Sequence, residues 1–191
     1  MPHRPHGQHN AYMFATPTTR VWRELFDAGK LNEAQSQYWQ EPKAVEELYD
    51  LAADHDEVYN LARVPEHRAD LERLRGALDA WQREIKDVDL LSEWEMRERS
   101  KGSTPYDIGH NPQKYDFEAV FAAAKLATSL HPGDLPKIVE LLKSKDGGVR
   151  YWGAVGLLAQ GQAGVAAGHD ALAAALNDAS PIVCVNAAEA L

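Results

Sequence analysis

Residues 138–157 read IVELLKSKDGGVRYWGAVGL, and residues 172–191 read LAAALNDASPIVCVNAAEAL. Apolar or small residues recur 34 positions apart in the two stretches, as Ile138/Leu172, Leu142/Leu176, Val149/Val183, Gly153/Ala187, Ala154/Ala188 and Leu157/Leu191. Each stretch predicts an apolar helix, a polar turn and a second apolar helix. A two-helix unit cannot bury its apolar face alone, so such units stack into an α-solenoid.

The sequence pattern of the first unit resembles that of a HEAT-type repeat. The pattern is Asp146-x-x-Val149-Arg150-x-x-x-Ala154-x-x-Leu157. The second unit keeps Asp178 and Val183 but has Cys184 in place of the arginine. Asp116 can cap the N-terminus of a further helix, which precedes the two units. We therefore expect a HEAT-like solenoid over residues 116–191, and its apolar end at Leu191 reads as the middle of a longer array.

Residues 99–115 predict a linker, because they contain the breaker clusters Gly102-Ser103-Thr104-Pro105 and Gly109-His110-Asn111-Pro112 and no periodicity. Before it, helices are expected at 17–29, at 32–38 with Asn32 as cap, and from Pro65 to about Lys86. Leu48–Leu51 predicts a short strand. The last helix carries a continuous apolar stripe that is expected to be buried, formed by Leu71, Leu74, Leu78, Trp81 and Ile85.

Composition restricts the function classes. The net charge is −9, and residues 41–100 hold 17 acidic against 9 basic residues, which disfavours nucleic acid and anionic membranes as partners. Cys184 is the only cysteine, so no internal disulfide forms. No apolar run reaches membrane-spanning length, and the first residues lack a signal-peptide core. The chain fits a cytosolic protein or an internal fragment.

Four patches, in family order, resemble the C-terminal part of sulfatases. They are Pro5–Gln8, Trp22–Leu31, the signature Glu47–Ala62 and a helix over Glu66–Trp81. His55 departs from the family, which commonly has proline there. The resemblance implies that residues 1–98 are a sulfatase C-terminal subdomain, in which the apolar stripe around Trp81 is core against the rest of the sulfatase fold. The whole fold class is then mainly α with a minor β element, joined to the solenoid.

The resemblance also implies a chemistry that lies elsewhere. Sulfatases hydrolyse sulfate esters with a formylglycine made from the first residue of a C/S-x-P-x-R motif, beside a divalent metal, calcium. Cys184 lies in Ile-Val-Cys-Val-Asn, and Ser103-Thr104-Pro105-Tyr106 is followed by Asp107 where arginine is required. We therefore expect no catalytic residue, metal ligand or cofactor here. The chain alone would be inactive and would pack on an N-terminal sulfatase domain, periplasmic or secreted if its parent has a signal peptide.

Two groups remain as candidate binding residues. His3, His6 and His9 recur every third position, as metal ligands can, but the prolines around them favour an extended loop. A substrate-side loop and plain structural histidines are the alternatives. Arg150, Tyr151 and Trp152 are candidates for binding a protein partner of the repeats, against a role of Trp152 in packing between them.

Three functional interpretations stay open at this point. The first is a sulfatase C-terminal fragment with a helical-repeat extension. The second is a non-enzymatic helical-repeat interaction module on a sulfatase-like platform. The third is a stand-alone cytosolic helical protein.

Overall fold

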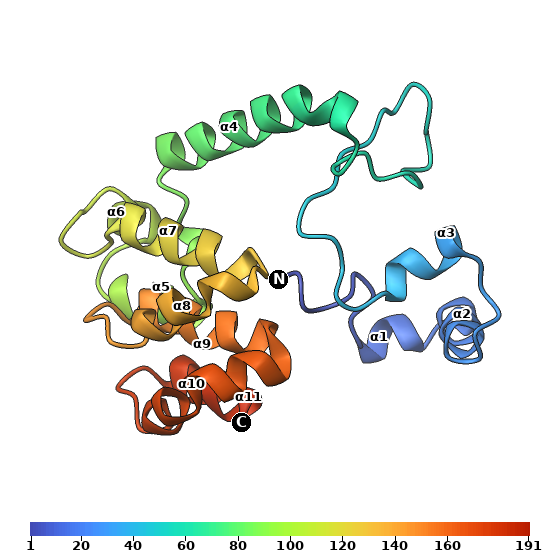
Figure 1. Cartoon of the computed structure of the whole chain (residues 1–191). Coiled ribbons are helices and arrows are strands. Elements are labelled where there is room, and N and C mark those ends of the chain that lie inside the picture. Colours follow the sequence, from blue (N-terminus) through green and yellow to red (C-terminus); the bar gives the residue numbers. More distant parts are fainter. The chain divides into compact units, whose positions relative to one another are not determined.

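The computed structural model describes residues 1–191 and is mainly helical, without a β-strand (Figure 1). The α-helices are α1 (Ala11–Phe14), α2 (Pro17–Asp27), α3 (Glu33–Ser36), α4 (Arg68–Ile85), α5 (Glu93–Arg99), α6 (Pro105–Gly109), α7 (Phe117–Thr128), α8 (Leu135–Leu141), α9 (Gly147–Ala159), α10 (Gly161–Ala175) and α11 (Pro181–Ala190). Short 3₁₀ helices lie at Gln37–Trp39, Pro65–His67, Val88–Leu90 and Pro132–Asp134. None of the helices combines the length and hydropathy of a membrane-spanning segment.

The chain forms two compact units, Met1–Leu71 (unit 1) and Glu72–Leu191 (unit 2), which are described separately. In unit 1 the predicted helices at 17–29 and 32–38 are confirmed. Proline at the first position of α2 suits a helix start, and Gly29 takes the left-handed φ of +64° just after its end. Asn32 caps α3 in a reciprocal capping box with Gln35.

Trp39 is the centre of unit 1, with 2% of its surface exposed. Its ring lies 5.9 Å from that of Phe14, 5.4 Å from Trp22 and 5.0 Å from Tyr38. Gly7 lies so close to the Trp39 and Tyr38 rings that no side chain could be added there. Aromatic packing of this kind adds to the apolar area that each ring buries.

The strand predicted at Leu48–Leu51 is wrong. Leu48 has no partner strand: its N–H donates to the side-chain oxygen of Asn60 (3.0 Å) and its carbonyl accepts from the N–H of Leu61 (2.7 Å). A turn follows at once, since the N–H of Ala53 donates to Asp50 O. A side-chain amide thus takes the place that a second strand would fill.

The helix predicted from Pro65 to Lys86 is confirmed as a 3₁₀ turn that continues into α4. Lys86 ends it with a left-handed φ of +53°. From Glu72 onward α4 belongs to unit 2, where it contacts α7 through two ion pairs. Arg83 Nε lies 3.1 Å from Glu118 Oε1, and Lys125 Nζ lies 2.8 Å from Asp79 Oδ1.

Unit 2 is built around α9, which packs on α7, α8, α10 and α11. Most central residues of α9 are apolar or small and buried, among them Ala154, Val155 and Leu157. Gly156 permits the close approach of α7, because a side chain there would meet Ile138 and Ala127. A helix that is apolar on nearly every side requires neighbours on every side.

Residues 99–115, predicted as a linker, pack into unit 2. Pro105–Gly109 form α6, with Thr104 as cap. Ile108 and Tyr115 are buried, and the Tyr115 hydroxyl donates to Asp87 O at 2.7 Å. The breaker clusters therefore mark the ends of a short helix. The boundary at 98/99 between a sulfatase-like part and a repeat part stays a prediction.

The pairs α8–α9 and α10–α11 follow the 34-residue offset. Leu142 and Leu176 end the first helix of each pair, and Asp146 and Ser180 precede the second. The turns also match, because the N–H of Asp146 donates to Ser144 Oγ and the N–H of Ser180 donates to Asp178 Oδ1. This arrangement is compatible with a helical solenoid.

Candidate functional site

The three N-terminal histidines lie in one loop of unit 1 but two of them have different neighbours. His6 Nε2 lies 2.9 Å from Glu47 Oε1, while the His9 ring packs on Phe14 with centroids 4.6 Å apart. No three His, Cys, Asp or Glu side chains converge anywhere as metal ligands would. The loop does connect to the sulfatase-like signature, through the contact of His6 with Glu47.

Asn60 holds the signature segment 47–62 together. Its side-chain nitrogen donates to Glu46 O (3.0 Å), and its side-chain oxygen accepts from the N–H groups of Leu48 and Ala62. Asp54 Oδ2 accepts from the N–H of Tyr59 at 2.7 Å. Asn60 and Asp54 thus satisfy backbone groups of the same loop. These contacts shape the loop, and none of them points to catalysis.

The two residues that could mimic a formylglycine precursor do not fit that role. Ser103 Oγ donates to Asp107 Oδ2 at 2.9 Å, and hydrogen bonds from Thr104 and Ser103 hold the pKa of Asp107 below its usual value. A carboxylate thus stands where the motif needs arginine. Cys184 is on α11, and its Sγ lies 3.2 Å from the backbone oxygen of Asp178. No step of sulfate-ester hydrolysis can be assigned to either residue.

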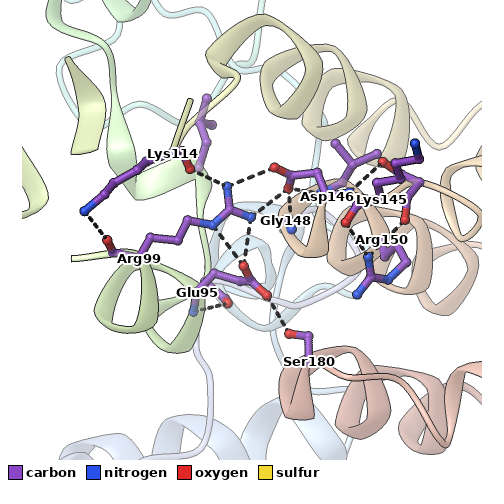
Figure 2. A network of polar contacts seen from close by, with 12 residues as sticks. Glu95, Arg99, Lys114, Lys145, Asp146, Gly148, Arg150 and Ser180 are labelled. Atoms are coloured by element: carbon purple, nitrogen blue, oxygen red, sulfur yellow. Dashed lines mark hydrogen bonds and ion pairs between the residues drawn. The ribbon is translucent and has the colours of Figure 1, made fainter. Parts of the chain in front are cut away.

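A network of charged side chains joins α5 to the starts of α9 and α11 (Figure 2). Glu95 is 6% exposed, accepts from Arg99 Nη2 (2.8 Å) through Oε2 and from Ser180 Oγ (2.6 Å) through Oε1. Arg99 also donates to both oxygens of Asp146, at 2.7 and 2.9 Å. Arg150 in turn donates to Asp178 at 2.6 and 2.7 Å.

The electrostatics of the network follow from these contacts. Burial alone raises the pKa of Asp146, but the hydrogen bond and charge of Arg99 outweigh it and lower the pKa below its usual value. Asp178 shows the same balance of burial against Arg150. Burial disfavours the Arg99 cation, yet Asp146 and Glu95 raise its pKa. The shifts of Asp146, Asp178 and Arg99 therefore all favour the charged forms that these contacts hold in the folded chain.

Sequence reasoning did not single out Glu95 or Arg99. Their spacing of four residues is an ordinary helical ion pair, and Glu93–Arg97, two residues earlier, has the same spacing at 3.6 Å on the surface. The two pairs differ in their burial. Glu95 and Arg99 are buried by helices that begin about fifty residues later in the chain.

The candidate partner-binding residues Arg150, Tyr151 and Trp152 lie in the interior of unit 2. Tyr151 is 8% and Trp152 9% exposed, and Trp152 Nε1 donates to Leu90 O at 2.8 Å. The Arg150 guanidinium forms an ion pair with the Asp178 carboxylate. These rings pack within the unit, so in this chain they present no exposed face to a partner.

The α4 stripe is exposed in this chain, and its burial against the rest of a sulfatase fold stays a prediction. Trp81 is 57% and Leu78 51% exposed, and Leu74 and Ile85 are exposed as well. Asp79 and Arg83, which pair with α7, precede Trp81 and Ile85 by two positions, about 200° around a helix. The polar side of α4 thus faces its own unit, and the apolar side faces away.

Two open grooves accompany these features. A groove of about 510 Å³ in unit 1 is lined by Pro17, Thr18, Val21, Trp22, Leu25, Leu31 and Gln35. One of about 670 Å³ in unit 2 is lined by Glu93, Trp94, Arg97, Glu98, Lys101 and Ile182. The first is mostly apolar, and the second is edged by charges of both signs.

Comparison with known proteins gives one informative match. The chain is 36% identical over 103 residues to the ulvan-active sulfatase of Formosa agariphila. This similarity relates the chain to sulfatases. The match covers 53% of the chain but only 17% of that relative's length. No family model matches the chain, and no solved structure matches it.

Proposed function

We propose that the chain is the C-terminal part of a sulfatase-related protein, with a HEAT-like helical extension, and that it supports a catalytic part rather than performing catalysis. The observation that carries this proposal is the 36% identity to a sulfatase over 103 residues. Hydrolysis of sulfate esters on a polysaccharide is then the reaction of the whole protein. The nucleophile and the calcium ligands are assigned to the part that precedes this chain.

The docking surface for that catalytic part is the α4 stripe of Leu74, Leu78, Trp81 and Ile85. Large apolar side chains on one side of a helix are normally covered in the folded protein. Nothing within unit 2 covers them, since α4 turns its polar side to α7. A catalytic domain joined to residue 1 supplies a neighbour of suitable size.

A chimera tests this proposal directly. In the ulvan-active sulfatase, the segment that aligns with this chain is replaced by the residues of this chain. We expect the chimera to fold and to release sulfate from ulvan, whereas the isolated chain with added calcium releases none. Turnover by the isolated chain would overturn the assignment of the chemistry to the preceding part.

Matched variants on α4 test the docking surface. Leu78→Glu in the chimera places a charge in the stripe and should reduce soluble, active protein by at least about tenfold. Ala80→Glu introduces the same residue at another exposed position of α4 and should have little effect. Equal effects of the two changes would exclude docking through the stripe.

The second candidate is a non-enzymatic helical-repeat interaction module, favoured by the two helix pairs at the 34-residue offset. In that case the chimera would fold without activity, and partner binding would depend on unit 2 alone. Sulfate release by the chimera therefore separates the two functions.

A further inference from the structure

The groove along the outer side of α5 combines an exposed tryptophan with charged groups of both signs. Its volume is about 670 Å³, and it is lined by Glu93, Trp94, Arg97, Glu98, Lys101 and Ile182. We propose that this groove is a saccharide-binding site, which holds a segment of the polysaccharide whose sulfate esters the whole protein hydrolyses. The identity of the ligand rests on the proposed function, whereas the site itself rests on the side chains of α5.

The helix α5 buries charged side chains and leaves its tryptophan outside. Glu95 is 6% exposed, and its partner Arg99 is mostly buried between Glu95 and Asp146. Trp94, next to Glu95 in the sequence, is 36% exposed. An ordinary amphipathic helix has the reverse arrangement, because burial stabilises an apolar ring and desolvation disfavours charges. The outer position of Trp94 therefore indicates a role other than packing.

The groove is formed mainly by α5 and not by the last helix, α11. Five of its six lining residues lie in the segment 93–101, and Ile182 alone comes from α11. Arg97 and Glu98 follow Trp94 by three and four residues, so they share one side of the helix with it. The indole ring and the charged groups therefore face the same space.

The indole N–H of Trp94 is available to a ligand, since it donates to no group of the chain. Two other tryptophans use this donor internally. Trp22 Nε1 donates to Gln35 O at 2.9 Å. Trp152 Nε1 donates to Leu90 O at 2.8 Å. A ligand that covers the Trp94 ring with an apolar face and places an acceptor at the ring edge satisfies both parts of this side chain.

The charged groups of the groove are held only by exposed ion pairs. Arg97 lies 3.6 Å from Glu93, with side chains 77% and 80% exposed. Lys101 Nζ lies 2.6 Å from Glu98 Oε2, with side chains 70% and 40% exposed. Exposed pairs of this kind are weak, so ligand hydroxyls displace them at little cost. The two cations and two carboxylates balance, and the groove therefore does not select a highly charged ligand.

A saccharide matches this combination of groups. The carbon-bound hydrogens of a sugar ring form an apolar face that stacks on an indole. Its hydroxyls donate to carboxylates and accept from guanidinium, ammonium and indole N–H groups. The polymer is thus held by ring stacking and hydroxyl contacts, and its sulfate groups are not required. A second contact of this kind raises the effective concentration of the polysaccharide at the catalytic part.

Titration of the 191-residue chain with ulvan oligosaccharides, followed by NMR of the indole N–H groups, tests the proposal. The chain has five tryptophans, and Trp94→Phe identifies the Trp94 signal by its absence. We expect saturable shifts of that signal and little change in the other four. Chemically desulfated oligosaccharides should bind with similar affinity. Raising the salt from about 50 to about 500 mM should change the affinity less than about threefold, because the charges of the groove balance.

Matched tryptophan variants separate the groove from non-specific contact with exposed rings. Trp94→Ala should weaken binding at least about tenfold, because it removes the ring on which the sugar stacks. Trp94→Tyr keeps an aromatic face and should retain part of the affinity. Trp81→Ala removes a more exposed ring (57%), on α4, and should leave the affinity unchanged. Circular dichroism should show all variants folded.

Three results would overturn the proposal: no binding by the folded chain, equal losses for Trp94→Ala and Trp81→Ala, or binding that is lost on desulfation. A groove that serves a protein segment would give the first result. The titration involves no turnover, so it is independent of the proposed function. An active chimera combined with a chain that binds no oligosaccharide would contradict only the saccharide site, whereas an inactive chimera would contradict the proposed function.

Discussion

Units 1 and 2 differ in how much apolar surface each buries for itself. In unit 1, Trp39 is the only large hydrophobic side chain that is buried, while Val21, Val45, Leu51 and Tyr59 are exposed. Unit 2 buries a continuous cluster centred on α9. Unit 1, which holds three of the four sulfatase-like patches, thus has little core of its own. That difference is expected if unit 1 completes its folding against a further domain, whereas the stacked helices of unit 2 form a core among themselves.

Separating the units should produce the largest effect. We expect a fragment of residues 68–191, which keeps α4 whole, to unfold cooperatively with a thermal midpoint within a few degrees of that of the full chain. The fragment 1–67 should show no cooperative transition, because its aromatic cluster around Trp39 buries too little area. Calorimetry and dispersion of amide proton shifts measure both. A cooperative transition in residues 1–67 would remove the contrast between the units.

The second prediction compares two arginines on α5. Arg99→Ala leaves the buried Glu95 and half-buried Asp146 without their cation and should cost about 3–5 kcal/mol. Arg97→Ala removes an exposed pair with Glu93 and should cost at most about 0.5 kcal/mol. Urea unfolding of both variants gives the difference. Similar losses would show that the network in Figure 2 is no more important than a surface pair.

The third prediction compares equivalent leucines of the two helix pairs. Leu157→Ala should destabilise unit 2 by about 2–5 kcal/mol, because it opens a cavity against α10. Leu191→Ala, at the matched position 34 residues later, should cost less than about 1 kcal/mol. The comparison is made by urea unfolding. A large loss at Leu191 would mean that this leucine is covered within the folded chain as Leu157 is.

Local sequence signals predicted much of the secondary structure. Asn32, Pro65 and Gly29 act where their cap, start and stop chemistry places them, since these effects involve only a few neighbouring residues. The polar turn expected within each repeat unit does separate α8 from α9 and α10 from α11. The strand at Leu48–Leu51 failed because its interpretation required a pairing partner, and Asn60 occupies that place.

Burial was less predictable, since it depends on distant contacts. Trp81 lies on a regular apolar stripe that this chain alone leaves exposed, and Trp152, for which partner binding and packing were both open, is buried with a hydrogen bond to Leu90. Glu95 gave no signal, because the residue that shares its carboxylate, Ser180, lies 85 positions later. Periodicity identifies the face of a helix, but only the tertiary arrangement decides what covers that face.

Acid should destabilise unit 2 through the two aspartates of the network, the smallest of the four effects. Their pKa values are lower in the folded chain than the usual value of about 3.9. The unfolded chain therefore binds protons at higher pH than the folded one. The resulting stabilisation is complete above about pH 5 and is lost as the pH falls through the folded pKa values.

Urea midpoints of the 68–191 fragment at pH 7, 5, 4 and 3 measure this dependence. Asp178→Asn should flatten the acid limb of the curve, because it removes the carboxylate that Arg150 binds. Asp170→Asn, at an exposed position of α10, is the matched control and should leave the limb as in the unmodified fragment. If both changes flatten the limb equally, the pH dependence arises from overall charge. In that case the ion pair of Arg150 with Asp178 would contribute little to the pH dependence of unit 2.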